Sequence, residues 1–450
     1  MRTVRSEVEV GAGISPIEAF DALDADVLLE NGERGWEATY VAAEAVETFE
    51  YRRDGGDGQK DCFDRLGEWL DSLPDSDAHT AAGAYGFVGY DIVKQIEDVP
   101  DDTERDIDLP DAWFGFYDTV AVLSDDGAYV EAVEHDAQDM SADERAERFI
   151  ERLEDSDYAL PEANVRARNR RSNFEREEYE KAVRRVKEYV RKGETFQTNI
   201  SQRLSFDSDA SPLAFYARLR ETNPAPYMGL IDIHDNGEGW SIVSSSPELL
   251  LRVEGNALST RPIAGTRPRE GEEKADETLR DELAASEKDR AEHSILVDLA
   301  RNDLGKVAEY GTVDVEDFME VVPYAEVHHL ESIVTAKRRD DADALDALRA
   351  VFPGGTVTGA PKPRTLGIIE ELEPTERGPY TGSMGRFALN GDATFNILIR
   401  TAVRDEDTYH LQVGGGVVHD SEPEREYDET LQKARGVLNA VEGEHAKEDV

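Results

Sequence analysis

The feature that most constrains the fold of this chain is that strand-like segments follow one another without helices between them. Residues 385–418 predict three antiparallel strands with turns at the tripeptides NGD and DED. Residues 240–269 predict a hairpin that turns at the Gly-Asn pair 255–256. A doubly wound parallel sheet needs strands that alternate with helices. The sequence therefore predicts an α+β fold built on antiparallel sheets.

Other segments have equally clear periodicity. Alternation over residues 195–206 predicts a strand, and helical spacing predicts helices over 176–193 and 287–307. In a strand, every second side chain lies on the same face of the sheet. One face of the predicted strand therefore carries Gln197, Asn199, Ser201 and Arg203.

The charge balance limits the partners that this protein can have. The chain has 450 residues, with 99 acidic and 50 basic side chains, and its formal net charge is -49. Nucleic acids and anionic membranes are polyanions, so both are excluded as expected partners. Only 12 of the 50 basic residues are lysines, and the acids are spread along the whole sequence. This composition resembles that of proteins from halophilic organisms, in which cations screen the self-repulsion.

The remaining composition predicts a cytoplasmic protein. Cys62 is the single cysteine, so internal disulfides and zinc sites built from cysteine are excluded. The N-terminus lacks the apolar core of a signal peptide, and no apolar run approaches membrane-spanning length. Residues 161–174 are basic and begin at a proline, which predicts a boundary between an N-terminal region, 1–160, and a second region, 170–443. Both regions are expected to share one intertwined globular unit.

Two predicted helices carry candidate metal ligands. In residues 419–438, Glu426, Glu429 and Lys433 are spaced so that they lie on one face, which is also the pattern of an ordinary solvated Glu–Lys pair. In residues 287–307, Glu292 shares a face with apolar side chains, so its carboxylate is drawn inward. A buried carboxylate needs an internal salt bridge or a metal ion. Two helices that each offer a carboxylate would suit Mg²⁺, which keeps waters and binds substrate oxygens.

Other residues leave alternatives open when they are taken alone. His329 is either a hydrogen-bonded core histidine or part of a site. Arg400 lies in the alternating segment FNILIRTAV, where it either faces solvent or binds an anion. The loop 352–362 lacks the GK[ST] ending of a phosphate-binding loop. No glutaminase-type nucleophile elbow surrounds Cys62.

Several segments in a fixed order resemble the chorismate-utilising enzymes. This family includes component I of anthranilate synthase, component I of aminodeoxychorismate synthase, and the isochorismate and salicylate synthases. The resemblance is strong over about 170–440 and weak before that. The segments that carry it are FQTNISQR, SSPELLLRVEG, RPIAGTRPR, DRAEHSILVDLARNDLGKV, VHHLES, FPGGTVTGAPK, GPYTGSMG, ILIRT and VGGGVVHDSEPEREYDETLQKAR.

The resemblance implies a fold of two large antiparallel sheets in a sandwich flanked by helices, with the active site between them. It also implies Mg²⁺ as the cofactor and chorismate as the substrate. Glu292 and Glu429, with Glu426 beside them, match the metal ligands of the family. Glu248 matches the carboxylate that assists loss of the 4-hydroxyl group of chorismate.

Further positions match the substrate site of the family. Tyr380 and Arg400 match residues that grip the enolpyruvyl carboxylate. The same resemblance places in the site Thr266, His329, Lys433 and the backbone amides of Gly414, Gly415 and Gly416.

The nucleophile is expected to be ammonia. Gln197 stands where the water-using relatives carry a lysine base, and an amide cannot deprotonate water, whereas ammonia needs no base. The ammonia is expected to come from a separate glutamine amidotransferase subunit.

Two products remain open. The segments FPGGTVTGAPK, VHHL, YTGSMG and NILIRT favour aminodeoxychorismate synthase. Against this, Ala264 stands where many aminodeoxychorismate synthases carry a nucleophilic lysine, and PIAGT is the spelling of anthranilate synthase. The first assignment is favoured because several segments support it, and the alternative product is anthranilate. In the segment LLEN (28–31), which resembles the LLES segment of the tryptophan-inhibited enzyme, Asn31 replaces the serine.

Overall fold

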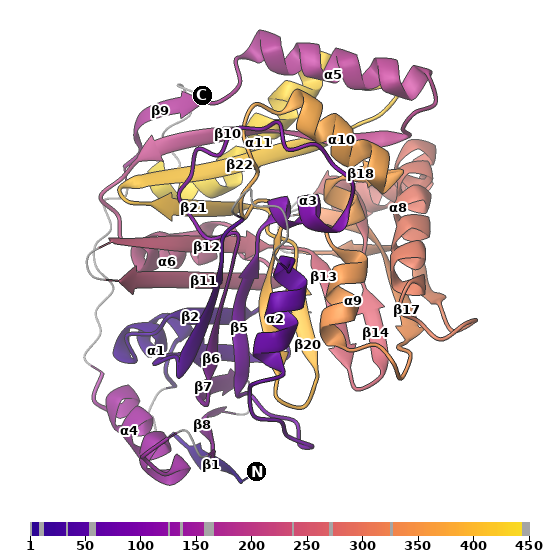
Figure 1. The fold of residues 1–450 in the computed structure, drawn as a ribbon. Coiled ribbons are helices and arrows are strands. Elements are labelled where there is room, and N and C mark those ends of the chain that lie inside the picture. The colour runs from indigo at the N-terminus through magenta and orange to yellow at the C-terminus, as the bar shows by residue number, and fades with distance from the viewer. Residues whose placement is uncertain are drawn as a thin grey trace.

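Two large antiparallel sheets form the body of the molecule in this computed structural model (Figure 1). The structure describes residues 2–8, 13–32, 35–53, 60–124, 127–135, 138–156, 166–235, 238–269, 273–324 and 327–442. The first sheet has the order β1 (Thr3–Glu7), β8 (Gly127–Val133), β7 (Thr119–Ser124), β3 (Thr39–Ala42), β2 (Val27–Asn31), β11 (Tyr227–Asp235), β12 (Glu238–Ser246), β21 (Thr401–Asp405), β22 (Thr408–Val417), β10 (Gln197–Asp207) and β18 (Gly359–Ala360), while β9 (Arg168–Ser172) also pairs with β10.

The second sheet is built in the same antiparallel way. Its order is β15 (Ile263–Pro268), β17 (Val327–Lys337), β14 (Ala257–Thr260), β13 (Leu249–Glu254), β20 (Ala393–Asn396), β19 (Ser383–Ala388), β5 (Gly83–Val88), β6 (Ala112–Tyr117) and β4 (Glu47–Tyr51), and β16 (Asp314–Pro323) also pairs with β17. Both sheets combine strands from early and late in the chain, because β2 pairs with β11 and β5 pairs with β19. The predicted α+β class is confirmed.

Helices pack against the sheets and against one another. In chain order they are α1 (Pro16–Ala22), α2 (Cys62–Leu70), α3 (Val93–Ile96), α4 (Ala142–Glu154), α5 (Arg176–Arg191), α6 (Pro212–Thr222), α7 (Glu273–Ala285), α8 (Glu287–Gly305), α9 (Ala344–Val351), α10 (Lys362–Leu372) and α11 (Pro423–Glu442), with 3₁₀ turns at Tyr90–Ile92 and Gly355–Val357. The helices predicted over 176–193 and 287–307 are confirmed as α5 and α8. No helix in the described ranges is long and apolar enough to cross a membrane.

An aromatic core lies between the two sheets. Trp36 packs edge-on against Tyr227 at 5.3 Å between ring centroids, and its indole nitrogen donates to the carbonyl of Met228 at 2.9 Å. Phe87 and Trp113 belong to the same buried cluster. A second apolar cluster joins α1, α4, α6 and α11 to the first sheet, and a third joins α2, α5, α8, α9 and α10 to strands of the second sheet. Burial of these faces is the main source of stability for such a layered fold.

The prediction of three strands in 385–418 was wrong, because the structure has four. The middle segment is divided into β20, in the second sheet, and β21, in the first sheet. Arg400 lies between them with φ at 51°, a left-handed conformation that interrupts a strand. The alternation of side-chain types in FNILIRTAV continues across this break. The sequence pattern therefore does not reveal that the chain passes from one sheet to the other. The hairpin predicted at 255–256 is confirmed as the β13–β14 pair.

A buried ion pair joins several of these elements. The guanidinium of Arg377, which is 2% exposed, donates to Glu373 at 2.9 and 2.7 Å. The same group donates to the carbonyl oxygens of Asn199 and Val357 at 3.1 and 3.0 Å. Glu373 also accepts from the backbone NH and hydroxyl of Ser201 at 2.8 and 2.9 Å. The pair therefore fixes β10 against the end of α10 and the loop that follows it.

Replacing Arg377 by methionine should lower the free energy of unfolding by about 3–5 kcal/mol, because Glu373 would be left as an unpaired buried charge. Urea unfolding at high KCl concentration measures this change. The matched control is Arg364→Met, since Arg364 pairs with Glu194 in a half-exposed position and its loss should cost less than about 1 kcal/mol. Equal losses in the two variants would contradict the structural role of Arg377.

Candidate active site

A glycine-rich strand forms the floor of the candidate site. β10 and β22 pair so that Asn199 lies opposite Gly416 and Ser201 lies opposite Gly414. A Cβ atom at Gly416 would overlap the amide nitrogen of Gln197. A Cβ atom at Gly414 would lie 2.6 Å from Asn199 Oδ1 and 2.9 Å from the hydroxyl of Tyr380. Only glycine leaves room for these side chains over β22.

Two helices bring three carboxylates close to this glycine-rich strand. Glu292 of α8 is partly buried, in line with its predicted inward position, and it accepts a hydrogen bond from Gln197 Nε2 at 2.6 Å. Glu426 and Glu429 lie on α11, and a Cβ atom at Gly415 would lie 3.4 Å from Glu426 Oε2. Burial raises the pKa values of both Glu292 and Glu426, and the charge of Glu429 raises both further.

Lys433 completes this side of the site. Its ammonium group lies 2.9 Å from Glu429 Oε1 and donates to the carbonyl of Gly414 at 2.9 Å. The predicted Glu429–Lys433 pair is therefore present, but it sits at the edge of the candidate site. This geometry ties the helix α11 to the glycine-rich strand.

The carboxylates fit a hard divalent cation that keeps other ligands. Their oxygens are the donors that Mg²⁺ prefers, and a cation would relieve the mutual repulsion that raises their pKa values. Within the described ranges, no three His, Cys, Asp or Glu side chains converge tightly enough to hold a metal alone. An ion held here by Glu292, Glu426 and Glu429 would therefore complete its coordination with water or substrate oxygens.

Glu248 supplies a buried acid. It lies between β12 and β13, it is 5% exposed, and its backbone carbonyl accepts from the NH of Ile397 at 2.9 Å. Burial raises the pKa of Glu248 to about 8, and the nearby Glu331 adds to this effect, while Thr356 opposes it by a hydrogen bond. The carboxyl group is therefore mainly protonated at pH 7 and can donate a proton.

Arg400 reaches the same region from the crossover between the sheets. Its carbonyl accepts from the NH of Ser245 at 3.2 Å, which fixes the backbone at its left-handed position. Burial lowers the pKa of Arg400, and the interaction with Glu248 raises it. A guanidinium in such surroundings favours an anionic ligand. The alternative of a solvent-facing arginine in a strand is excluded by the structure.

His329 and Thr266 face each other across β17 and β15. His329 Nδ1 lies 3.0 Å from the hydroxyl of Thr266. Burial lowers the pKa of His329 to about 4, and the charge of Arg400 adds to this, so the imidazole is neutral at pH 7. Ala264 is buried on the same strand β15 and lies opposite Leu330. The position of Ala264 therefore offers a methyl group and no nucleophile.

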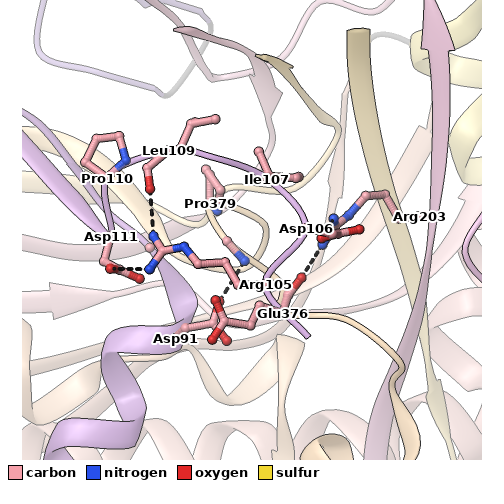
Figure 2. A pocket seen from close by; sticks show the side chains of 12 residues that line it. Asp91, Arg105, Asp106, Ile107, Leu109, Pro110, Asp111, Arg203, Glu376 and Pro379 are labelled. Carbon is pink, nitrogen blue, oxygen red and sulfur yellow. Dashed lines mark hydrogen bonds and ion pairs between the residues drawn. The ribbon is translucent and has the colours of Figure 1, made fainter. Parts of the chain in front are cut away.

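Charged residues outside the predicted active-site set support the loop that carries Tyr380. Asp91 accepts from the NH of Gly378 at 2.7 Å, and Arg203 donates to the carbonyl of Glu376. Figure 2 shows these residues around a small pocket. Arg203 and Asp106 form a further ion pair there. The cavity is about 20 Å³, which suits one or two waters and not a substrate. These charged groups position the loop.

A larger cavity lies apart from the predicted catalytic and metal-ligand residues. Its volume is about 460 Å³, and Asn31, Trp36, Arg252 and Arg261 are among the residues that line it. None of the metal-ligand candidates or Glu248 belongs to this lining. The candidate site is therefore identified by the chemical groups of its residues and not by the volume of the cavity.

The comparisons with known proteins show the family of this chain. Residues 24–439 match the chorismate binding enzyme family. The chain is 44% identical to anthranilate synthase component 1 3 of Haloarcula marismortui, over 91% of this chain and 84% of that protein. It is 41% identical to aminodeoxychorismate synthase component 1 of Bacillus subtilis, over 80% of this chain and 77% of that protein.

Solved structures give the same fold. Anthranilate synthase component I of Streptococcus pneumoniae superposes with a TM-score of 0.79 at 31% identity, over 96% of this chain and 100% of that one. The menaquinone-specific isochorismate synthase of Escherichia coli superposes with a TM-score of 0.76 over 98% of this chain and 94% of that one. At 19% identity, the second likeness concerns the fold alone. The sandwich expected from the sequence is thus confirmed.

Proposed function

This chain belongs to the chorismate binding enzyme family, and we propose that it aminates chorismate with ammonia to give 4-amino-4-deoxychorismate. The observation that carries the proposal is the hydrogen bond between Gln197 and Glu292. It places a carboxamide, which cannot deprotonate water, beside the carboxylates that would hold the metal. A nucleophile that needs no base is therefore favoured at this site.

The residues of the site suit this reaction. Arg400, Tyr380 and the backbone amides of β22 would bind the carboxylates of chorismate. Mg²⁺ would be held by Glu292, Glu426 and Glu429, and when bound it would neutralise the ring carboxylate. Glu248 would donate its proton to the 4-hydroxyl group while the C4–O bond breaks, and water would leave. The ammonia nitrogen forms the new bond to C4 and returns one proton to Glu248, so the atoms balance.

A second candidate product is anthranilate, with pyruvate released. Ala264 favours it, because this position has no amine to attack C2 before ammonia enters at C4. Several relatives with high identity also bear the name anthranilate synthase. The segments around Thr358 and Tyr380 support the first product, since their spelling resembles aminodeoxychorismate synthase. Relatives named component 1 support a partner subunit, and a separate glutaminase would supply the ammonia.

The purified chain should convert chorismate in high salt when Mg²⁺ and ammonium chloride are present. A product that a lyase converts to 4-aminobenzoate would support the first assignment, and fluorescent anthranilate would support the second. Chorismate recovered unchanged would contradict amination. Glutamine alone should give no product, and glutamine-dependent turnover by this chain alone would contradict the need for a separate glutaminase.

The variants Glu292→Gln and Glu429→Gln should each abolish turnover, because each removes one anionic ligand of the metal. Binding of Mn²⁺, followed by electron paramagnetic resonance, should weaken at least tenfold in both variants, and this readout does not depend on activity. Glu424→Gln is the matched control on α11, since Glu424 lies outward and pairs with Arg184. Unchanged Mn²⁺ affinity in Glu292→Gln would contradict the assigned ligands.

The turnover number should fall as pH rises through about 8, because Glu248 has its pKa raised to that value and acts in its protonated form. Glu248→Gln should lower the turnover number about 10²–10⁴-fold, which is the usual contribution of a general acid. The rates must be compared at a constant concentration of free ammonia at each pH. A wild-type profile that stays flat between pH 6 and 9 would rule out this role of Glu248.

A further inference from the structure

Two buried carboxamide oxygens in the site have no hydrogen-bond donor. Gln197 Oε1 and Asn199 Oδ1 lack partners, and their residues are 4% and 8% exposed. Both residues lie on β10, two positions apart, so they share the face that carries the glycine-rich floor. A buried acceptor without a donor costs about 1–3 kcal/mol. A pair of them on one face indicates that a bound donor completes the site.

The surroundings hold both groups in this arrangement. The side-chain N–H of Gln197 donates a hydrogen bond to Glu292 at 2.6 Å, so the amide oxygen points away from that carboxylate. The backbone of Asn199 is fixed at both ends, because its NH donates to Thr358 at 2.9 Å and its carbonyl accepts from Arg377 at 3.1 Å. β10 therefore cannot shift to find other donors for the two oxygens.

The chemistry of the two oxygens selects their ligand. Neutral carbonyl oxygens accept hydrogen bonds and do not attract carboxylates, so they do not suit the anionic groups of chorismate. A ring hydroxyl has a single hydrogen to donate. Ammonia has three N–H donors and keeps its lone pair free when it donates two of them.

We propose that Gln197 Oε1 and Asn199 Oδ1 together bind the ammonia that attacks chorismate, with Asn199 as the second acceptor beside Gln197. This inference rests on the proposed amination. It assigns Asn199 to nucleophile binding, a role distinct from metal binding by Glu292 and from proton donation by Glu248. As the new C–N bond forms, positive charge develops on nitrogen, and both oxygens stabilise it.

The test is steady-state kinetics of the full chain in high salt, with Mg²⁺ and with ammonium chloride as the nitrogen source. Asn199→Leu keeps the approximate shape of the side chain and removes the acceptor. It should raise the KM for ammonium at least tenfold while the KM for chorismate changes less than twofold. Gln197→Met should raise the KM for ammonium similarly. Thr198→Val, on the opposite face of β10, is the control and should leave both constants within twofold.

Several results would overturn the inference. An unchanged KM for ammonium in Asn199→Leu would mean that the oxygens hold only water. A raised KM for chorismate alone would mean that they bind the ring hydroxyl, and a lower kcat with both KM values unchanged would mean that Asn199 only positions other groups. If Asn199→Leu does not fold, judged by circular dichroism, Asn199→Ala carries the same expectation. A wild-type chain without ammonium-dependent turnover would overturn the proposed function as well, whereas an active wild type with unaffected variants overturns this inference alone.

Discussion

The buried ion pair between Arg377 and Glu373 is the interaction on which the rest of the site depends. Five hydrogen bonds from Arg377 reach Glu373, the backbone of β10, the 3₁₀ turn at 355–357 and Thr381. Desolvating two charges is expensive, and it is tolerated here because every partner is well placed. The ion pair fixes the position of β10, which carries Asn199, relative to the loop that carries Tyr380.

Around this anchor, each side of the site uses a different physical device. The floor consists of glycines because Gln197, Asn199 and Tyr380 occupy the space of their side chains. The side that carries Glu292, Glu426 and Glu429 concentrates negative charge from two helices, which makes a cation favourable there. The acid side uses burial to keep the proton on Glu248. Burying polar groups lowers stability unless each group has a hydrogen-bond partner. The two carboxamide oxygens of β10 have no such partner, so a bound ligand that donates hydrogen bonds would remove this loss of stability.

Much of the site could be predicted from local patterns. Alternation placed Gln197 and Asn199 on one face of a strand, and the helical spacing of α8 placed Glu292 inward. Both predictions are confirmed. Each concerns the direction of side chains within a single strand or helix, which the local periodicity determines. The strand around Arg400 could not be predicted in this way, because its alternation continues while the chain passes from one sheet to the other. Asp91 gave no signal, since its contact with Gly378 joins residues 287 positions apart.

The sequence by itself determined the fold class, many of the helices and strands, and the candidate residues, because these follow from patterns along the chain. Only the tertiary structure decided which groups meet. It joined Gln197 to Glu292 and left the carboxamide oxygens of β10 without donors. It also raised the pKa of Glu248 and lowered the pKa of His329, because the pKa of a side chain depends on burial and on neighbours from distant elements. Such surroundings exist only after both sheets have formed, so no local pattern can encode them.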